Sequence, residues 1–389
     1  MLQKIFKATL GLTIALIPLY VVRFKIGPIP TTLLEILIYF SFILFLISGA
    51  QSAIKNKTPL SLGALFVFAG LLGALLDPHL GAGLGLWKSY FFDGYLLLVM
   101  ILSIKKDEIA GVLNFLIAGG LLTTLMSFYL YSHGIKTEDN RLLDFAILSP
   151  NYLAMYLVPI LIISISQMVK FFKKSRVYLI YLLSAIILTY ALYLTGSRGG
   201  YIAALSGLIV ILFSHFATGK KKKLVKIGLW VGLAILLVVT VWAFRPDWSS
   251  HGRKATSSNI RYYIWTTSIE MIGREPVFGV GLSNYQGYFS TLTQDRVNFP
   301  EFITPEALTA HNLYLEIYLT CGLLGLITFI IFLLNSKFYQ IRNIALCAAM
   351  ISILIFGFFD TPFFRNDLSA IFWVLIALVY SVSLAKQTN

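Results

Sequence analysis

Charge, cysteine and histidine are all scarce in this chain, and each scarcity removes a class of function. Charged residues make up only 12% of the 389 positions. The two cysteines, Cys321 and Cys347, both fall inside apolar runs, which argues against a disulfide framework and against a cysteine metal site. The 5 histidines form no close pair with a cysteine or carboxylate, so no metal is expected.

Nucleotide-binding signatures are also missing. The chain has no P-loop and no dinucleotide-binding fingerprint on a strand, so nucleotide-driven work and cofactors are not expected. The segment GAGLGLW (Gly81 to Trp87) is rich in glycine but lacks a flanking strand. We interpret it as a flexible loop.

What the sequence has in abundance is long apolar runs. Hydrophobic residues make up 58% of the chain, and the runs are roughly 17 to 22 residues long, which is the length that crosses a bilayer. The sequence therefore predicts an all-α integral membrane protein, one polytopic domain over residues 1–389 with about twelve transmembrane helices. The predicted spans are 6–22, 32–49, 60–76, 88–104, 109–131, 149–169, 177–195, 200–217, 226–243, 313–335, 341–359 and 367–384.

The net charge of +14 is distributed between the apolar runs rather than gathered in one patch, so nucleic acid is not an expected partner. With the amino terminus inside, about eighteen basic residues face the cytoplasm against only Asp107 and Glu108, as the positive-inside rule requires. The opening MLQKIFK resembles a signal peptide, but we interpret it as the start of the first span. We therefore expect both termini to be cytoplasmic.

One connection is far longer than neighbouring helices need. Residues 245–310 are predicted to form an extracytoplasmic (periplasmic) loop of roughly 65 residues, and long ordered loops usually carry function. Within it, SSNIRYYIWTTSIEMIG (Ser257 to Gly273) predicts an amphipathic helix with a stripe of isoleucine and methionine.

Two arginines are expected at this outer face. Arg198 lies in TGSRGG, a tight break between two spans, where glycines permit close backbone approach and guanidinium suits phosphate. Arg261 lies in the first turn of the loop helix, with Trp265 one turn later. The alternatives are an arginine that reaches lipid headgroups for Arg198, and an arginine stacked on an aromatic ring for Arg261.

A histidine is the third candidate. His311 lies in AHNLYLEIYLT, where the long loop re-enters the membrane, and its imidazole can remove a proton near neutral pH. The alternative is a structural cap. Asn312, Tyr314 and Glu316 are supporting candidates. Glu35, inside the second predicted span, is either a functional acid or a partner in a hydrogen bond at a helix end.

Three segments in this order resemble the O-antigen ligase and O-antigen polymerase family of bacterial membrane glycosyltransferases. They are TGSRGGYIAALSGLIVIL, NIRYYIWTTSIEMIGREPVFGVGLSNY and AHNLYLEIYLTCGLLGLITFI, which cover mainly residues 190–335. The resemblance implies a GT-C-like helical enzyme that takes a glycan from undecaprenyl pyrophosphate and passes it to an acceptor hydroxyl. It implies a location in the bacterial inner (cytoplasmic) membrane. It also implies Arg198 and Arg261 as the groups that engage the pyrophosphate, and His311 as the group that activates the acceptor.

The residues agree with metal-independent, inverting transfer, in which Arg253 and Lys254 are auxiliary charges and Trp265, Asn312 and Tyr314 contact substrate. An O-antigen ligase would use a lipid A core sugar as acceptor in lipopolysaccharide biosynthesis. The short chain with its one dominant loop favours a ligase over a polymerase. A Wzy-type polysaccharide polymerase would use a second lipid-linked repeat. A transporter or lipid flippase is a more distant alternative, because it would need paired charges within the membrane.

Overall fold

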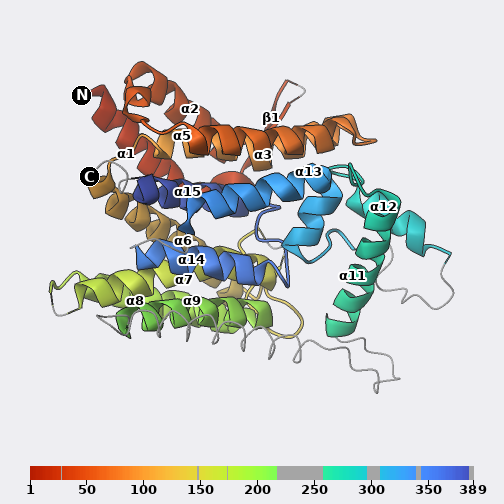
Figure 1. Cartoon of the computed structure of the whole chain (residues 1–389). Helices are drawn as coiled ribbons and strands as arrows, with labels where there is room; N and C mark the ends of the chain where they lie inside the picture. The colour runs from red at the N-terminus through yellow and green to blue at the C-terminus, as the bar shows by residue number, and fades with distance from the viewer. Residues whose placement is uncertain are drawn as a thin grey trace.

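The structure is a computed structural model that describes residues 1–27, 29–146, 149–172, 174–216, 257–295, 307–338 and 343–384. Most helices lie side by side in a bundle, and two further helices lie at one end of it (Figure 1). The N-terminus and the last turn of α15 lie at the opposite end (Figure 1). In chain order the helices are α1 (Leu2–Ala15), α2 (Leu33–Ile47), α3 (Thr58–Leu75), α4 (Leu80–Trp87), α5 (Asp93–Ile101), α6 (Ile109–Ser132), α7 (Pro150–Phe171), α8 (Tyr178–Thr195), α9 (Arg198–Phe216), α11 (Ser257–Arg274), α12 (Tyr285–Thr293), α13 (Leu313–Ser336), α14 (Ile344–Phe356) and α15 (Asn366–Leu384).

Six helical segments of the described part are long and apolar enough to cross a membrane: Thr58–Leu75, Leu80–Ile101, Lys106–Ser132, Pro150–Phe171, Tyr178–Thr195 and Leu313–Ser336. Shorter apolar helices accompany them at Leu33–Ile47, Arg198–Ser214, Ile344–Phe356 and Asn366–Val382. The chain is thus a multi-pass, helical membrane protein. Each predicted span within the described residues overlaps a helix. The predicted span at 226–243 lies outside the described residues. The count of twelve stays a prediction.

The bundle is organised around α15, which is buried along most of its length. Trp373 is fully buried and donates its indole N–H to the Tyr90 carbonyl at 2.9 Å. Outer helices instead expose apolar residues, as Ile180, Leu183 and Ile186 do along one face of α8. Apolar side chains can face outwards at no cost when the surrounding solvent is lipid rather than water.

One local prediction is wrong. Gly81 to Trp87 is not a flexible loop but α4, which packs against α3 so closely that a Cβ on Gly83 would lie 2.9 Å from the Ala74 carbonyl. A small hairpin of β1 (Arg23–Ile26) and β2 (Ile29–Thr32) precedes α2 in this otherwise helical part of the chain. Its register pairs Ile26 with Ile29, and Gly27 adopts φ +59° in the turn, a conformation that glycine accepts without strain.

Glu35 has the structural role that was one of its two interpretations. It is the third residue of α2 and completes a capping box with Thr32. Its carboxylate also accepts from Lys88 Nζ at 2.7 Å and from Ser89 Oγ at 3.1 Å. The acid is therefore satisfied at a helix end, next to the short π-helical turn Lys88–Phe92.

The long loop is inserted into a break in α13. Gly322 has non-helical backbone angles, and the Val280 amide donates to the Leu319 carbonyl at 2.6 Å while the Leu323 amide donates to Val277 at 3.0 Å. These bonds satisfy the backbone groups that the break leaves without helical partners, as a membrane interior requires. The insertion joins the α11–α12 pair to the helix that follows His311.

We expect Gly279→Ala to destabilise this junction. Gly279 has φ +71°, and a Cβ there would lie 2.2 Å from the Leu319 carbonyl oxygen. The strain should cost about 1–3 kcal/mol or more, visible as a lower thermal midpoint in detergent. Gly273→Ala on α11 is the matched control, because nothing lies within 4 Å of its Cβ position. An unchanged midpoint for Gly279→Ala would show that the junction tolerates movement.

Candidate active site

The turn that carries Arg198 is built by its neighbours. Gly196 ends α8 in the left-handed conformation, with φ 59°. Thr195 Oγ1 then accepts from the Ser197 amide at 3.2 Å, and Ser197 Oγ accepts from the Gly200 amide at 3.2 Å. Hydroxyls at this position cap free helix amides, so α9 begins at Arg198. The TGSRGG sequence thus reverses the chain and presents Arg198 at the start of α9.

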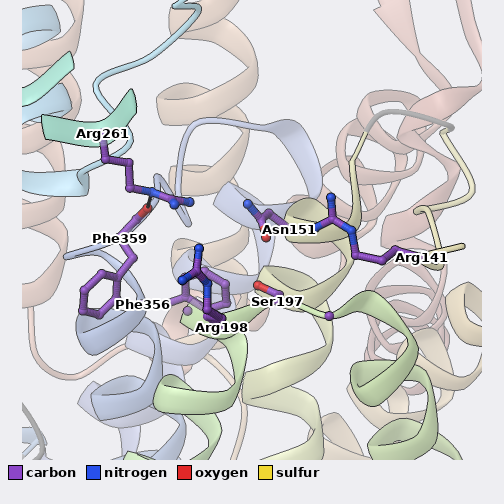
Figure 2. Close-up of a pocket in the computed structure, with 9 residues that line it drawn as sticks. Arg141, Asn151, Ser197, Arg198, Arg261, Phe356 and Phe359 are labelled. Carbon is purple, nitrogen blue, oxygen red and sulfur yellow. Dashed lines mark hydrogen bonds between the residues drawn. The ribbon is translucent and has the colours of Figure 1, made fainter. Parts of the chain in front are cut away.

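Arg261 reaches the same place from α11. This helix is held against α12 and α13 by its apolar face, on which Ile264 and Met271 are buried. The Arg261 Nε donates to the Phe359 carbonyl at 3.1 Å, which fixes the side chain over the segment between α14 and α15. Arg198 and Arg261 line one pocket and point into it from different helices (Figure 2). The other lining residues are Arg141, Asn151, Gly196, Ser197, Gly199, Phe356 and Phe359.

His311 lies beside this pocket and is held by its backbone. It adopts φ 45°, an unusual value for a residue with a side chain. Trp265 Nε1 on α11 donates to the His311 carbonyl at 3.3 Å, and the Glu316 carboxylate accepts from the Ala310 amide at 2.6 Å. The imidazole itself remains 36% exposed. The His311 ring is therefore accessible while its main chain is fixed from two sides.

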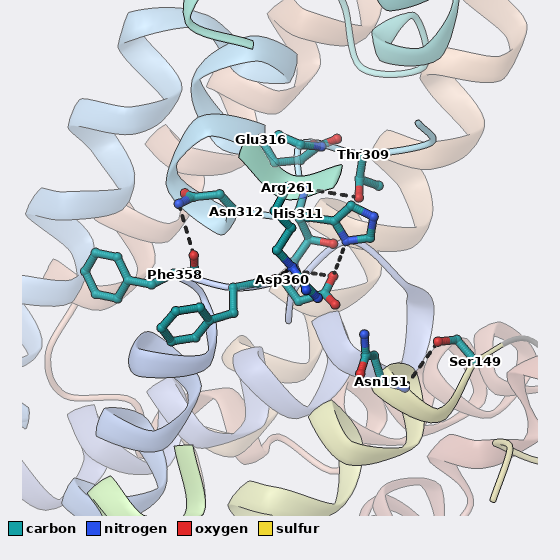
Figure 3. Close-up of polar contacts among 12 residues, drawn as sticks. Ser149, Asn151, Arg261, Thr309, His311, Asn312, Glu316, Phe358 and Asp360 are labelled. Carbon is teal, nitrogen blue, oxygen red and sulfur yellow. Dashed lines mark hydrogen bonds and ion pairs between the residues drawn. The ribbon is translucent and has the colours of Figure 1, made fainter. Parts of the chain in front are cut away.

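Asp360 is the partner of His311. The His311 Nδ1 lies 3.2 Å from Asp360 Oδ1, and this contact is drawn in Figure 3. Asp360 is 5% exposed and also accepts from the Thr361 amide at 3.0 Å. Burial raises the pKa of the Asp360 carboxyl, but His311, Arg261 and the Thr361 amide together outweigh it, so the net pKa lies below the usual value. The carboxyl is thus ionised at neutral pH.

The electrostatics of the pocket favour an anion. Burial lowers the pKa of Arg261 and neighbouring Arg198 lowers it further, whereas Asp360 acts in the opposite direction. Two guanidiniums that repel each other are stabilised by a negative group bound between them. Phosphate is the group that this geometry suits, because each guanidinium offers paired donors.

The structure thus brings Arg198, Arg261 and His311 into one region. His311 does not line the arginine pocket itself. The link runs through Asp360, which follows the pocket residue Phe359 in the chain and interacts with both His311 and Arg261 (Figure 3). The described residues contain no group of three or more histidine, cysteine or acidic side chains that could hold a metal.

The remaining predicted residues lie around this region in different ways. Asn312 caps α13, since its Oδ1 accepts from the Tyr314 amide at 3.0 Å and the Leu315 amide at 3.1 Å. The Tyr314 hydroxyl donates to the Leu354 carbonyl at 2.8 Å. Both side chains hold structural bonds next to His311, so their substrate contacts stay a prediction. Arg253 and Lys254 lie outside the described residues.

Sequence reasoning missed three polar residues of this region: Arg141, Asn151 and Asp360. Asp360 lies in FFDTPFFRND between two predicted spans, and a polar group in so apolar a segment was the available signal. Arg141 and Asn151 belong to the connection before α7 and to its first turn. Nothing in their local sequence indicates that they would meet Arg198.

The fold and this region define a multi-pass membrane protein with an arginine-lined, anion-accepting pocket beside a histidine–aspartate pair. Residues 183–330 match the family model described as O-Antigen ligase, so the resemblance noted in the sequence is confirmed.

Two curated proteins are similar over longer stretches. An uncharacterized protein of Haemophilus influenzae is 24% identical over 212 residues, which cover 49% of this chain and 53% of that protein. An O-antigen ligase of Salmonella typhimurium is 24% identical over 292 residues, which cover 70% of this chain and 69% of that protein. The match with the first of them therefore spans about half of that relative's length.

Proposed function

We propose that this chain is a membrane glycosyltransferase that moves a glycan from undecaprenyl pyrophosphate to the hydroxyl of an acceptor sugar. The observation that carries the proposal is the pocket shared by Arg198 and Arg261, next to the pair formed by His311 and Asp360. A lipid-linked pyrophosphate needs cations at the membrane boundary, and an alcohol acceptor needs a base beside them. The match to the O-antigen ligase family model supports the same reading.

His311 is the general base in this mechanism. With its Nδ1–H donated to Asp360, the other ring nitrogen is left as the acceptor for the proton of the attacking hydroxyl. The hydroxyl oxygen forms a bond to the anomeric carbon as the bond from that carbon to the pyrophosphate oxygen breaks. Direct displacement inverts the configuration, and no metal is required.

Arg198 and Arg261 are the pyrophosphate clamp. The leaving undecaprenyl pyrophosphate gains negative charge as it departs, and cations already held in place stabilise such a developing charge at little cost in reorganisation. The SRG turn (Ser197–Gly199) sets the backbone of Arg198 at the start of α9, and the Phe359 carbonyl holds the Arg261 side chain. Trp265 positions His311 through its carbonyl, and Arg253 and Lys254 remain proposed as auxiliary charges.

We propose the extracytoplasmic side of the bacterial inner membrane for this reaction. The positive-inside rule leaves few basic residues at outer helix ends, so arginines retained there need a specific reason. α11, which carries the pocket residue Arg261, lies at the end of the bundle opposite the N-terminus (Figure 1). The donor's isoprenoid tail can then stay in lipid while its pyrophosphate reaches water.

We propose the lipid A core as the acceptor, which is the acceptor expected for an O-antigen ligase. The reason is that the Salmonella relative is named O-antigen ligase. A deletion strain separates this from a polymerase through its lipopolysaccharide. Bare core together with accumulated lipid-linked polymer is the expected result. Single-repeat caps on the core would instead identify a polymerase.

The direct test of the enzyme is reconstitution. Purified chain is mixed with undecaprenyl-pyrophosphate-linked glycan and acceptor in the presence of a chelator, and glycan transfer is measured. Transfer without added metal is expected. No product at any pH, together with flux of the lipid in liposomes, would replace the enzyme by a transporter.

Asp360→Asn is expected to lower the rate of transfer by about 100-fold or more while donor binding is kept. The amide can donate to His311 Nδ1 and so favours the wrong tautomer of the imidazole. Asp360→Glu keeps a carboxylate and should recover part of the rate, which loss of folding would not allow. Equal activity of the asparagine variant at equal membrane abundance would remove Asp360 from the mechanism.

A further inference from the structure

A third arginine lines the pocket, and neither the family match nor the sequence motifs assign it a role. We propose that Arg141 binds the second phosphate of the donor, so that the site selects pyrophosphate-linked over monophosphate-linked lipid. The proposal rests on the donor pocket proposed above and adds a specificity-determining residue to it.

The backbone of Arg141 is fixed by a turn of its own. The Arg141 amide donates to Thr137 Oγ1 at 2.8 Å, and the Thr137 amide donates to the Arg141 carbonyl at 3.2 Å. The next residue, Leu142, donates its amide to the Leu194 carbonyl at 2.8 Å. The connection before α7 is therefore joined to the last turn of α8, just ahead of the SRG turn.

The side chain then crosses the SRG turn. A Cβ on Gly196 would lie 2.8 Å from Arg141 Cδ, so only a glycine at this point leaves room for the arginine stem. Figure 2 shows Arg141 and Asn151 on one side of Arg198, and Arg261 on the other. The basic groups therefore extend along the pocket rather than meet at one point.

The spread of basic side chains along the pocket matches the spread of negative charge over the two phosphates of a pyrophosphate. A pyrophosphate diester carries one negative charge on each phosphate, whereas a monophosphate diester carries only one in all. Arg261 lies beside Asp360 and His311, so it faces the phosphate that bears the sugar. Arg141, at the other side of the pocket with Asn151, faces the phosphate that bears the isoprenoid.

Asp139 does not prevent this role. Arg141 Nε lies 2.7 Å from Asp139 Oδ2, but the Asp139 side chain is 61% exposed and that of Arg141 is 40% exposed. Such exposed ion pairs contribute little. A guanidinium has further N–H groups that can contact phosphate while Nε keeps its partner.

The test measures lipid binding, which does not depend on turnover. Undecaprenyl pyrophosphate and undecaprenyl monophosphate compete with a labelled undecaprenyl pyrophosphate for the full chain in nanodiscs. The wild type should prefer the pyrophosphate. Arg141→Gln should weaken binding of the pyrophosphate roughly 10- to 100-fold with much less effect on the monophosphate. Arg141→Lys should recover part of the preference, because it restores the charge.

Arg274→Gln is the matched control, since Arg274 lies on α11 in an exposed pair with Glu270. It should leave the preference unchanged. Equal weakening of both lipids by Arg141→Gln, or weakening of neither, would overturn the proposal. A preference that depends on Arg141 in a protein without transfer activity would instead overturn the proposed function alone.

Discussion

Replacing His311 by alanine is expected to reduce glycan transfer about 10²- to 10⁴-fold, the usual contribution of a positioned general base. Donor binding should stay close to that of the wild type, because the arginine pocket does not include His311. The measurement is single-turnover transfer at saturating donor, paired with donor affinity of the same preparation. A loss in rate alone identifies a residue that acts on the acceptor.

The control for this variant is His133→Ala. His133 is exposed at the end of α6, and its ring lies against the preceding turn, where Nδ1 lies 2.8 Å from the Tyr129 carbonyl. Its replacement should leave both rate and affinity unchanged. Undiminished transfer by His311→Ala at matched abundance would show that another group removes the proton.

Replacing Arg198 or Arg261 by alanine should reduce transfer about 10²- to 10³-fold, as loss of one charge-stabilising donor does. In contrast with His311, these variants should also lose donor affinity, because the arginines engage the donor before reaction as well as during it. Lysine keeps the charge but not the planar pair of donors, so Arg→Lys should recover only part of the loss.

Arg274→Ala on the same helix as Arg261 separates this effect from a general change of charge. It should behave as the wild type, since the side chain pairs with Glu270 outside the pocket. Normal affinity in Arg198→Ala and Arg261→Ala would mean that the pyrophosphate binds elsewhere. A parallel fall in the thermal midpoint would assign the loss to folding instead.

Elements with strong local signals could be predicted from the sequence. The helix expected at Ser257 to Gly273 is α11, Ser257–Arg274, because its apolar stripe, its polar face and its glycine end all agree. The break at TGSRGG could be predicted from its glycines and its position between two apolar runs, and the structure adds the capping bonds of Thr195 and Ser197. Each of these features depends on interactions between residues that are near in sequence.

Features that depend on distant contacts could not be predicted. The glycines of Gly81 to Trp87 predict a loop, yet one of them, Gly83, allows α4 to approach the end of α3. The Trp87 indole adds a bond of 2.9 Å to the Val67 carbonyl. Tertiary packing therefore outweighs the low helix propensity of glycine here.

The partners within the site were hidden for the same reason. Asp360 is 49 residues from His311 in the chain, and only the fold brings the two together. Buried Arg365 helps to fix this segment, since its guanidinium lies 2.6 Å from Asp144 and 2.7 Å from Asp367. Asp144 belongs to the connection that also carries Arg141. This buried ion cluster thus joins the connection before α7 to the segment between α14 and α15. No spacing rule in the sequence indicates it.

An experimental structure with an unreactive undecaprenyl-pyrophosphate sugar bound tests the proposed site most directly. Phosphate oxygens are expected within hydrogen-bonding distance of Arg198 and Arg261, and the anomeric carbon on the side of His311. A pyrophosphate bound away from both arginines, or a sugar turned away from His311, would contradict it.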